Sequence, residues 1–280
     1  MAIRGFGEVA ERLRRSTVQV TLGNGRERGS GSGVIWNEDG LIVTNAHVAR
    51  ADRVRVELWD GRSFDAEVQA RDSRRDLASL SIPARGLPAV TPGDSSALRA
   101  GEIVMAVGNP LGFIGALTTG VVHSQGPLRG MGRQPWVQAA VRLAPGNSGG
   151  PLADAQGCVV GINTMVVAGG LALAVPSNHV GDFLKRGASR PSLGVTLRPV
   201  NIGRSSPGIG LLILDVSPEG AAGRASLLMG DLLTGANGQP FRSLDDLSDA
   251  VDSASSGLLS LQFLRGGRHT QREVAVRLAA

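Results

Sequence analysis

Apolar and polar residues alternate along three N-terminal segments of the chain. The apolar positions are Val18, Val20 and Leu22, then Val54, Val56 and Leu58, then Phe64, Ala66 and Val68. A period of two is typical of strands with one buried face. Further short apolar runs lie at residues 33–36, 41–44, 77–82, 103–107, 118–123, 136–141, 159–163 and 171–175. Turn residues separate these runs and no long amphipathic helix interrupts them, so a short helix at 6–15 followed by an all-β sandwich or barrel is predicted.

The pattern changes after about residue 192. Strand-like runs at 193–198, 211–216 and 258–265 flank a helical stretch at 243–254, for which Ser243 is the expected N-cap. Glycine, serine and proline are found at 187–191, where one unit is expected to end and the next to begin. We therefore predict a mainly β domain at residues 1–186 and an α+β domain at 191–280.

Composition narrows the function classes. Of 280 residues 40 are glycine and only 9 are aromatic (6 Phe, 3 Trp, no Tyr), which favours tight turns and an aliphatic core. The net charge of +5 is spread along the chain, so nucleic acid is not an expected partner. Cys158 is the single cysteine and is expected to be a small buried residue; His123, His179 and His269 lack metal-ligand spacing. No metal or organic cofactor is expected.

The N-terminal segment is charged and lacks the apolar core of a signal peptide, and no run reaches the length of a membrane span. We expect a soluble protein. Its compartment stays open: cytoplasmic as the chain stands, or periplasmic if a leader has been removed.

A glycine-rich loop carries the most chemically informative residue. It reads Gly146-Asn147-Ser148-Gly149-Gly150-Pro151. A serine becomes a nucleophile when a base lies beside it and a carboxylate orients that base. His47 follows an apolar run and Asp76 precedes another. The order His47, Asp76, Ser148 is that of the chymotrypsin triad.

The segment from Gly146 to Gly150 also fits the Gly-x-Ser-x-Gly elbow of α/β-hydrolases. In those enzymes the acid and the histidine follow the serine, and a helix begins after the elbow. Only His179 and His269 follow Ser148 here, and no helical pattern begins. This alternative is less well supported.

Several segments in order resemble the HtrA/Deg serine proteases, which join a trypsin-like domain to a PDZ domain. The segments are Gly29-Ser30-Gly31-Ser32-Gly33-Val34-Ile35, Ile42-Val43-Thr44-Asn45-Ala46-His47-Val48, Arg75-Asp76-Leu77-Ala78, Val107-Gly108-Asn109-Pro110-Leu111-Gly112 and Gly161-Ile162-Asn163. The resemblance implies a chymotrypsin-like double β-barrel with His47 as base, Asp76 as its orienting group and Ser148 as nucleophile. It also implies an oxyanion hole formed by the N–H groups of Gly146 and Ser148.

The resemblance further implies a specificity pocket walled by Leu143, Leu171 and Leu173, which favours aliphatic side chains. Arg142 stands where the trypsin-like pattern places the pocket floor and where the family usually has a small residue. An unpaired buried guanidinium is costly, so Arg142 is expected to face solvent; if it faced the pocket, acidic side chains would be favoured.

The C-terminal unit resembles a bacterial PDZ domain. The expected carboxylate-binding loop is Ser192, Leu193, Gly194 and Val195, and the expected groove-lining residues are Leu244, Leu247 and Val251. Such a domain binds peptide C-termini by adding a strand to a sheet edge. The same three helical positions also fit plain core packing.

We therefore expect an ATP-independent serine endopeptidase that cleaves unfolded or damaged proteins, with peptide C-termini as PDZ ligands and a homotrimer implied by the resemblance. Asn147 replaces the aspartate of secreted zymogens, so activation by propeptide cleavage is not expected. The rival hypothesis is a chaperone-like binding protein whose serine site is inactive.

Overall fold

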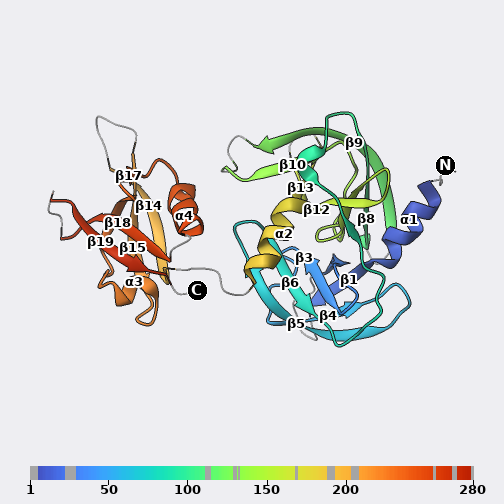
Figure 1. Cartoon of the computed structure of the whole chain (residues 1–280), viewed down its shortest axis with the longest axis horizontal. Helices are drawn as coiled ribbons and strands as arrows, with labels where there is room; N and C mark the ends of the chain where they lie inside the picture. Colours follow the sequence, from blue (N-terminus) through green and yellow to red (C-terminus); the bar gives the residue numbers. More distant parts are fainter. Residues whose placement is uncertain are drawn as a thin grey trace. The chain divides into compact units, whose positions relative to one another are not determined.

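The structure is a computed structural model that describes residues 6–22, 30–110, 115–128, 131, 133–167, 170–187, 193–202, 208–254, 257–266 and 270–278. The chain divides into two units, Met1–Ala188 and Ser189–Ala280. The first unit contains the strands of the predicted protease domain, and the second contains one antiparallel sheet with helices (Figure 1).

Six strands of the first unit close into a barrel in the order β1-β2-β3-β6-β5-β4. Their bounds are β1 (Thr17–Leu22), β2 (Ser30–Ile35), β3 (Leu41–Thr44), β4 (Arg53–Glu57), β5 (Ser63–Asp72) and β6 (Leu77–Ser81). The predicted alternation is visible in β4, where Val54 and Val56 point into the barrel while Arg53 and Arg55 are exposed. Closure into a barrel decides between the two predicted architectures.

The second barrel joins β11 (Pro151–Asp154), β8 (Ile103–Gly108), β9 (Ala116–Pro127), β10 (Pro135–Ala139), β13 (Ala172–Pro176) and β12 (Cys158–Val166) in that order. Pairing of β11 with β12 closes the ring, and the short β7 (Thr91–Pro92) adds to β12 in parallel. A 3-10 turn, η1 (Ser95–Ala97), follows β7. Met105, Leu152 and Ile162 are fully buried and show the expected aliphatic core.

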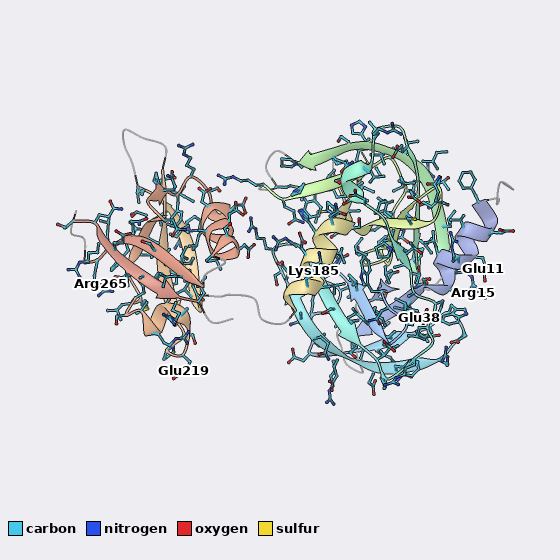
Figure 2. The ribbon with its side chains drawn as sticks, viewed as in Figure 1. Glu11, Arg15, Glu38, Lys185, Glu219 and Arg265 are labelled. Atoms are coloured by element: carbon cyan, nitrogen blue, oxygen red, sulfur yellow. The ribbon has the colours of Figure 1, made fainter. Side chains whose placement is uncertain are left out.

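Helix α1 (Phe6–Arg15) confirms the predicted N-terminal helix. It buries Val9 and Leu13. Its outer face carries Glu11, whose carboxylate accepts hydrogen bonds from Arg14 and Arg15 (Figure 2). These guanidinium groups lower the pKa of Glu11 to about 2. Such exposed pairs add little stability.

Helix α2 (Ser177–Arg186) was not predicted. It starts directly after Pro176 at the end of β13 and stops at Gly187, which has φ +61°. Only Val180 and Phe183 are clearly buried apolar side chains, so the ten-residue segment has a weak apolar stripe. Packing against the second barrel, more than the periodicity of the sequence, stabilises this helix.

The second unit has a sheet in the order β14-β15-β16-β18-β19, with β17 paired to β16. The bounds are β14 (Val195–Asn201), β15 (Ile209–Val216), α3 (Ala221–Arg224), β16 (Leu232–Ala236), β17 (Gln239–Pro240), α4 (Leu244–Ser253), β18 (Leu258–Leu264) and β19 (Arg272–Arg277). Ser243 is the N-cap of α4 as predicted, and the Asp246 carboxylate accepts its N–H. None of the described helices has the length and apolar character that crossing a bilayer requires.

Candidate active site

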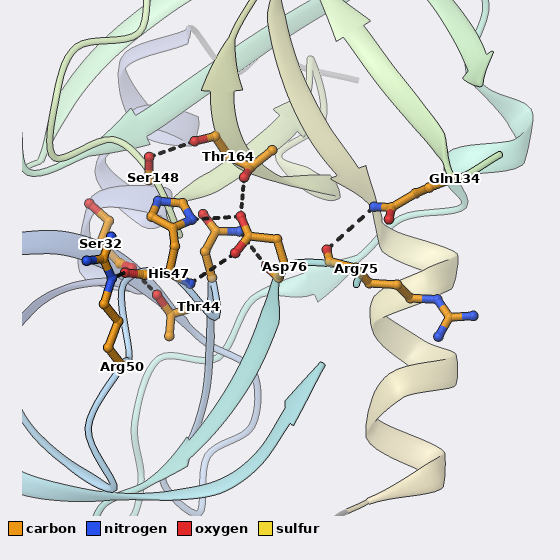
Figure 3. Close-up of polar contacts among 10 residues, drawn as sticks. Ser32, Thr44, His47, Arg50, Arg75, Asp76, Gln134, Ser148 and Thr164 are labelled. Atoms are coloured by element: carbon orange, nitrogen blue, oxygen red, sulfur yellow. Dashed lines mark hydrogen bonds and ion pairs between the residues drawn. The ribbon is translucent and has the colours of Figure 1, made fainter. Parts of the chain in front are cut away.

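His47 and Asp76 meet because the strands that carry them are neighbours. His47 follows β3 and Asp76 precedes β6, and these strands pair with Thr44 opposite Ala78. His47 Nδ1 lies 2.7 Å from Asp76 Oδ2, and the His47 backbone N–H donates to Asp76 Oδ1 at 3.0 Å (Figure 3). The aspartate therefore contacts both the ring and the backbone of the histidine, as an orienting group requires.

The Asp76 carboxylate has a third donor, the Thr164 hydroxyl, which bonds Oδ2. The Asp76 backbone has φ +54°, a conformation that is uncommon for a residue other than glycine. Asn45 Nδ2 donates to the Asp76 carbonyl at 2.8 Å. The surrounding bonds thus hold the aspartate in a conformation that it rarely adopts alone.

Ser148 lies in the loop between β10 and β11, and Thr164 links it to the aspartate, because this one residue bonds both Ser148 and Asp76 (Figure 3). Ser148 Oγ donates to the Thr164 carbonyl at 2.7 Å. Among the described side chains no hydrogen bond joins Ser148 to His47. Hydrogen bonds between catalytic groups are often incomplete in ligand-free structures. The Ser148 hydroxyl must release the Thr164 carbonyl before it can donate to the histidine, because it carries a single hydrogen.

Gly146 adopts a backbone conformation that a side chain would prevent. Its φ is +106°, and a Cβ placed on it would lie 2.6 Å from the Asn109 carbonyl oxygen. Within the described residues neither the Gly146 N–H nor the Ser148 N–H donates a hydrogen bond. Both amides are thus free for a ligand oxygen, which is the state expected of the two oxyanion-hole donors.

A cavity of about 670 Å³ opens beside the histidine and the aspartate. Its lining combines polar groups with apolar side chains from the strands of the second barrel and the loop before β10. The lining residues are His47, Ser73, Arg74, Asp76, Met131, Gln134, Trp136, Thr164 and Met165. The cavity thus borders two residues of the candidate triad, His47 and Asp76.

The four residues assigned to the specificity pocket do not share one environment. Leu171 is half-buried and lines a separate cavity of about 550 Å³ together with Arg142. Arg142 is exposed, and in the described part of the chain its guanidinium has no carboxylate partner. Leu143 is half-buried, whereas Leu173 is fully buried in the barrel core. The side chain of Leu173 therefore packs in the core and does not face a pocket.

The predicted peptide-binding residues of the second unit are mostly packed inside it. Leu193, Leu247 and Val251 belong to its hydrophobic core. Val195 opens β14 and is half-buried, and Gly194 has φ +69°. Ser192 and the side chain of Leu244 lie outside the described residues.

Cys158 is a free, half-buried thiol. Burial raises its pKa, and the nearby Asp154 carboxylate raises it further. A raised pKa disfavours the nucleophilic thiolate. The described residues also contain no group of three or more His, Cys, Asp or Glu side chains arranged to hold a metal ion.

Sequence reasoning missed two residues that contact the candidate site. Thr164 follows directly after the Gly161-Ile162-Asn163 segment that carries part of the family resemblance. A polar residue at the end of an apolar run is the sequence feature that could have identified it as a site residue. Ser32 lies inside the first recognised segment, but its contacts with the loop that carries Ser148 span 116 residues and no local pattern reveals them.

Two family profiles match the chain. The trypsin-like peptidase domain matches residues 31–162, and the PDZ domain matches residues 191–276. The probable periplasmic serine endoprotease DegP-like of Halomonas elongata is 38% identical over 276 residues, covering 91% of this chain and 58% of the relative. Protease Do-like 1, chloroplastic, of Arabidopsis thaliana is 35% identical, covering 85% of this chain and 61% of the relative. The chain thus spans less than two thirds of these relatives.

Solved structures cover the chain more completely. The serine endoprotease from Yersinia pestis has a TM-score of 0.71 at 27% identity and covers 100% of both chains. The HtrA-type protease AlgW with a decapeptide has a TM-score of 0.69 at 26% identity and covers 99% of both chains. The similarity therefore extends over both units of the chain.

Proposed function

Because the chain belongs to the HtrA family of trypsin-like serine proteases with a PDZ domain, we propose that it is an ATP-independent serine endopeptidase that cleaves unfolded or damaged proteins. The observation that carries this proposal is the set of contacts in which the Asp76 carboxylate bonds His47 and Thr164, while the Thr164 carbonyl accepts the Ser148 hydroxyl. Ser148 is the proposed nucleophile, His47 the proposed base and Asp76 the proposed orienting carboxylate, which are the three groups that acyl transfer by a triad requires.

In the proposed reaction Ser148 Oγ attacks the carbonyl carbon of the scissile peptide bond, and its proton passes to Nε2 of His47. The carbonyl oxygen becomes negatively charged and accepts hydrogen bonds from the N–H groups of Gly146 and Ser148. The C–N bond then breaks while His47 returns the proton to the leaving amine. Water then attacks the acyl carbon while His47 takes its proton, and the C–O bond to Ser148 breaks as His47 returns that proton to Ser148 Oγ. No step consumes a nucleotide.

The substrate pocket is proposed to accept aliphatic side chains. Leu143 and Leu171 are apolar and half-buried, and the exposed Arg142 is solvated. When an unfolded protein such as reduced lactalbumin is digested without ATP, we expect most products to end in Val, Ala, Leu or Ile. Sequencing of the product termini by mass spectrometry measures this, with the folded, oxidised substrate expected to be cleaved far more slowly.

Arg142→Ala is the matched variant for this prediction. If Arg142 stays in solvent, the distribution of cleaved bonds is unchanged by the substitution. Dominant cleavage after Asp or Glu that disappears in Arg142→Ala would instead make this arginine the specificity determinant, because its charge would then pair with the substrate carboxylate.

The second unit is proposed to bind peptide C-termini along β14. Among the described strands β14 pairs with β15 alone and forms an edge of the sheet, so its outer N–H and C=O groups can accept an added strand. The loop before it contains Gly194, where a Cβ would lie 2.9 Å from Gly220 Cα. A close backbone turn of this kind brings N–H groups toward a carboxylate.

We expect the inactive full-length Ser148→Ala chain to bind an apolar peptide with a free C-terminus roughly 10- to 100-fold more tightly than the same peptide as a C-terminal amide, because hydrogen bonds to a charged group contribute about 1.5–3 kcal/mol. Calorimetric titration measures both affinities. In Gly194→Ala, whose added Cβ displaces the loop, the preference for the free carboxylate should vanish. Equal affinities of the two peptides for the parent chain would exclude the proposed binding mode.

Self-association is also proposed, as the trimer that the family resemblance implies. Ile103 on β8 and Val121 on β9 are cross-strand partners, and both side chains are exposed. Adjacent exposed aliphatic residues on a sheet are common at interfaces between chains. We assign this face to contacts between copies of the chain.

A further inference from the structure

Ser32 is a buried residue of β2 whose hydroxyl links two loops of the second barrel. Ser32 Oγ donates to the Gly146 carbonyl at 2.6 Å and accepts the Asn109 N–H at 2.9 Å. The direction of both bonds follows from chemistry, because a backbone N–H only donates and a carbonyl only accepts. The hydroxyl hydrogen therefore points at the Gly146 carbonyl.

The backbone of Ser32 bonds the same loop at a second point. Its N–H donates to the Ser148 carbonyl at 2.8 Å. The two carbonyls that Ser32 holds, those of Gly146 and Ser148, flank the peptide group that carries the Ser148 N–H. Ser32 thus contacts the loop on both sides of one proposed oxyanion-hole donor.

The peptide groups after Gly146 are held by further hydrogen bonds. The Asn147 N–H donates to the Ala144 carbonyl at 3.0 Å, and the Asn147 carbonyl accepts the Gly150 N–H at 3.0 Å. The Gly149 N–H donates to the Asn163 carbonyl at 2.8 Å. Each of the three peptide groups between Gly146 and Gly149 therefore has at least one fixed end.

The peptide group that carries the Gly146 N–H differs from these three because, in the described part of the chain, no hydrogen bond fixes either of its ends. Among the described residues neither the Gly146 N–H nor the Pro145 carbonyl makes a hydrogen bond. Its orientation depends on the Gly146 torsions, at a residue that already has φ +106°. Glycine rotates more freely than any other residue. The nearest anchors of this donor are thus the Gly146 carbonyl, held by Ser32, and the Asn147 N–H of the same peptide group.

Strand β2 packs closely against the loop that carries Ser148. A Cβ on Gly149 would lie 2.0 Å from the Ser32 carbonyl oxygen, and a Cβ on Gly31 would lie 3.1 Å from the Ser148 carbonyl oxygen. Ser32 itself has no exposed surface. Strand β2 and the loop therefore touch backbone to backbone.

We propose that the Ser32 hydroxyl is a positioning group for the oxyanion hole: by holding the Gly146 carbonyl it keeps the Gly146 N–H directed at the reacting carbonyl oxygen. This inference rests on the proposed function, because an oxyanion hole has meaning only for a working protease. Ser32 is a positioning residue and touches no substrate atom in this account. Its contribution is stronger in the transition state, where the oxygen is charged, than in the substrate complex.

The test compares Ser32→Ala with Thr44→Val. Thr44 is also buried, and its hydroxyl donates to the Ser32 carbonyl at 2.6 Å, so its removal deletes a buried hydrogen bond to the same residue without freeing Gly146. For Ser32→Ala we expect kcat on a peptide ester to fall roughly 10- to 100-fold, somewhat less than the 10²–10³ of a deleted oxyanion donor, with KM within about twofold. Thr44→Val should keep kcat within about threefold at a similar loss of thermal stability.

A second readout separates positioning from general damage. A peptide boronate forms a tetrahedral adduct with the nucleophile, so its affinity should fall by the same factor as kcat/KM in Ser32→Ala. Should Ser32→Ala not fold, Ser32→Cys is measured in its place, because the thiol is a weaker donor at the same position and is expected to give a smaller fall in kcat. Boronate affinity that stays at the wild-type value overturns the inference.

The remaining outcomes are distinct. An unchanged kcat in Ser32→Ala, or an equal loss of kcat in Thr44→Val, overturns the positioning role while leaving the proposed protease intact. Absence of any Ser148-dependent hydrolysis by the wild-type chain, by contrast, refutes the proposed function itself, and with it this inference.

Discussion

Ser148→Ala is expected to lower kcat for casein cleavage by on the order of 10⁶, because members of a catalytic triad act as a unit and alanine offers no nucleophile. Only the background rate that binding and the oxyanion hole provide should persist. Within the part of the chain that the structure describes, the one hydrogen bond of Ser148 Oγ is its donation to the Thr164 carbonyl. The variant should therefore fold normally, and steady-state kinetics on fluorescent casein measure its loss of activity.

The matched control is Ser63→Ala, which removes a half-buried serine from β5 in the first barrel. Its kcat should equal that of the wild type. Mass spectrometry after treatment with a fluorophosphonate should place the label on Ser148 alone, since only an activated serine reacts rapidly. A label on another serine, or casein cleavage that persists in Ser148→Ala, contradicts the assigned nucleophile.

Asp76→Asn is expected to lower kcat by roughly 10⁴, with little change in the thermal unfolding temperature. The carboxylate accepts hydrogen bonds from the His47 backbone N–H, from His47 Nδ1 and from Thr164 Oγ1. A carboxylate can accept all three bonds because both of its oxygens are acceptors. An amide presents N–H at one of these positions. If it faces Nδ1, the proton moves to Nε2, and His47 cannot accept the proton of Ser148.

Thr164→Val is the companion variant, because it removes one donor to Asp76 and leaves the contact between Asp76 and His47 in place. We expect kcat to fall roughly tenfold, because a hydrogen bond to a charged carboxylate contributes about 1.5–3 kcal/mol and the contact between Asp76 and His47 remains. The rate of fluorophosphonate labelling should decrease in the order wild type, Thr164→Val, Asp76→Asn. An Asp76→Asn chain that retains a tenth of wild-type kcat would remove Asp76 from the mechanism.

Local sequence patterns predict the family of this protein and many of its strands. Alternation at Val54 and Val56 predicts a strand because a period of two places both side chains on one face, and that face is buried in the barrel. The resemblance of several ordered motifs is confirmed by the family profiles and by the solved structures. Sequence thus suffices for the β-rich class and the appended α+β unit, while the triad of His47, Asp76 and Ser148 stays a prediction.

Tertiary structure alone decided the closure of the strands into barrels, the start of α2 at Ser177, and the burial of Leu173 in the core instead of a pocket wall. It also placed the Thr164 hydroxyl on Asp76 across 88 residues and the Ser32 hydroxyl on Gly146 across 114 residues. Periodicity and motif spacing report on neighbours within one element. Contacts between elements depend on how the two barrels pack, and hydroxyl groups so far apart in sequence become partners only when that packing brings their strands together.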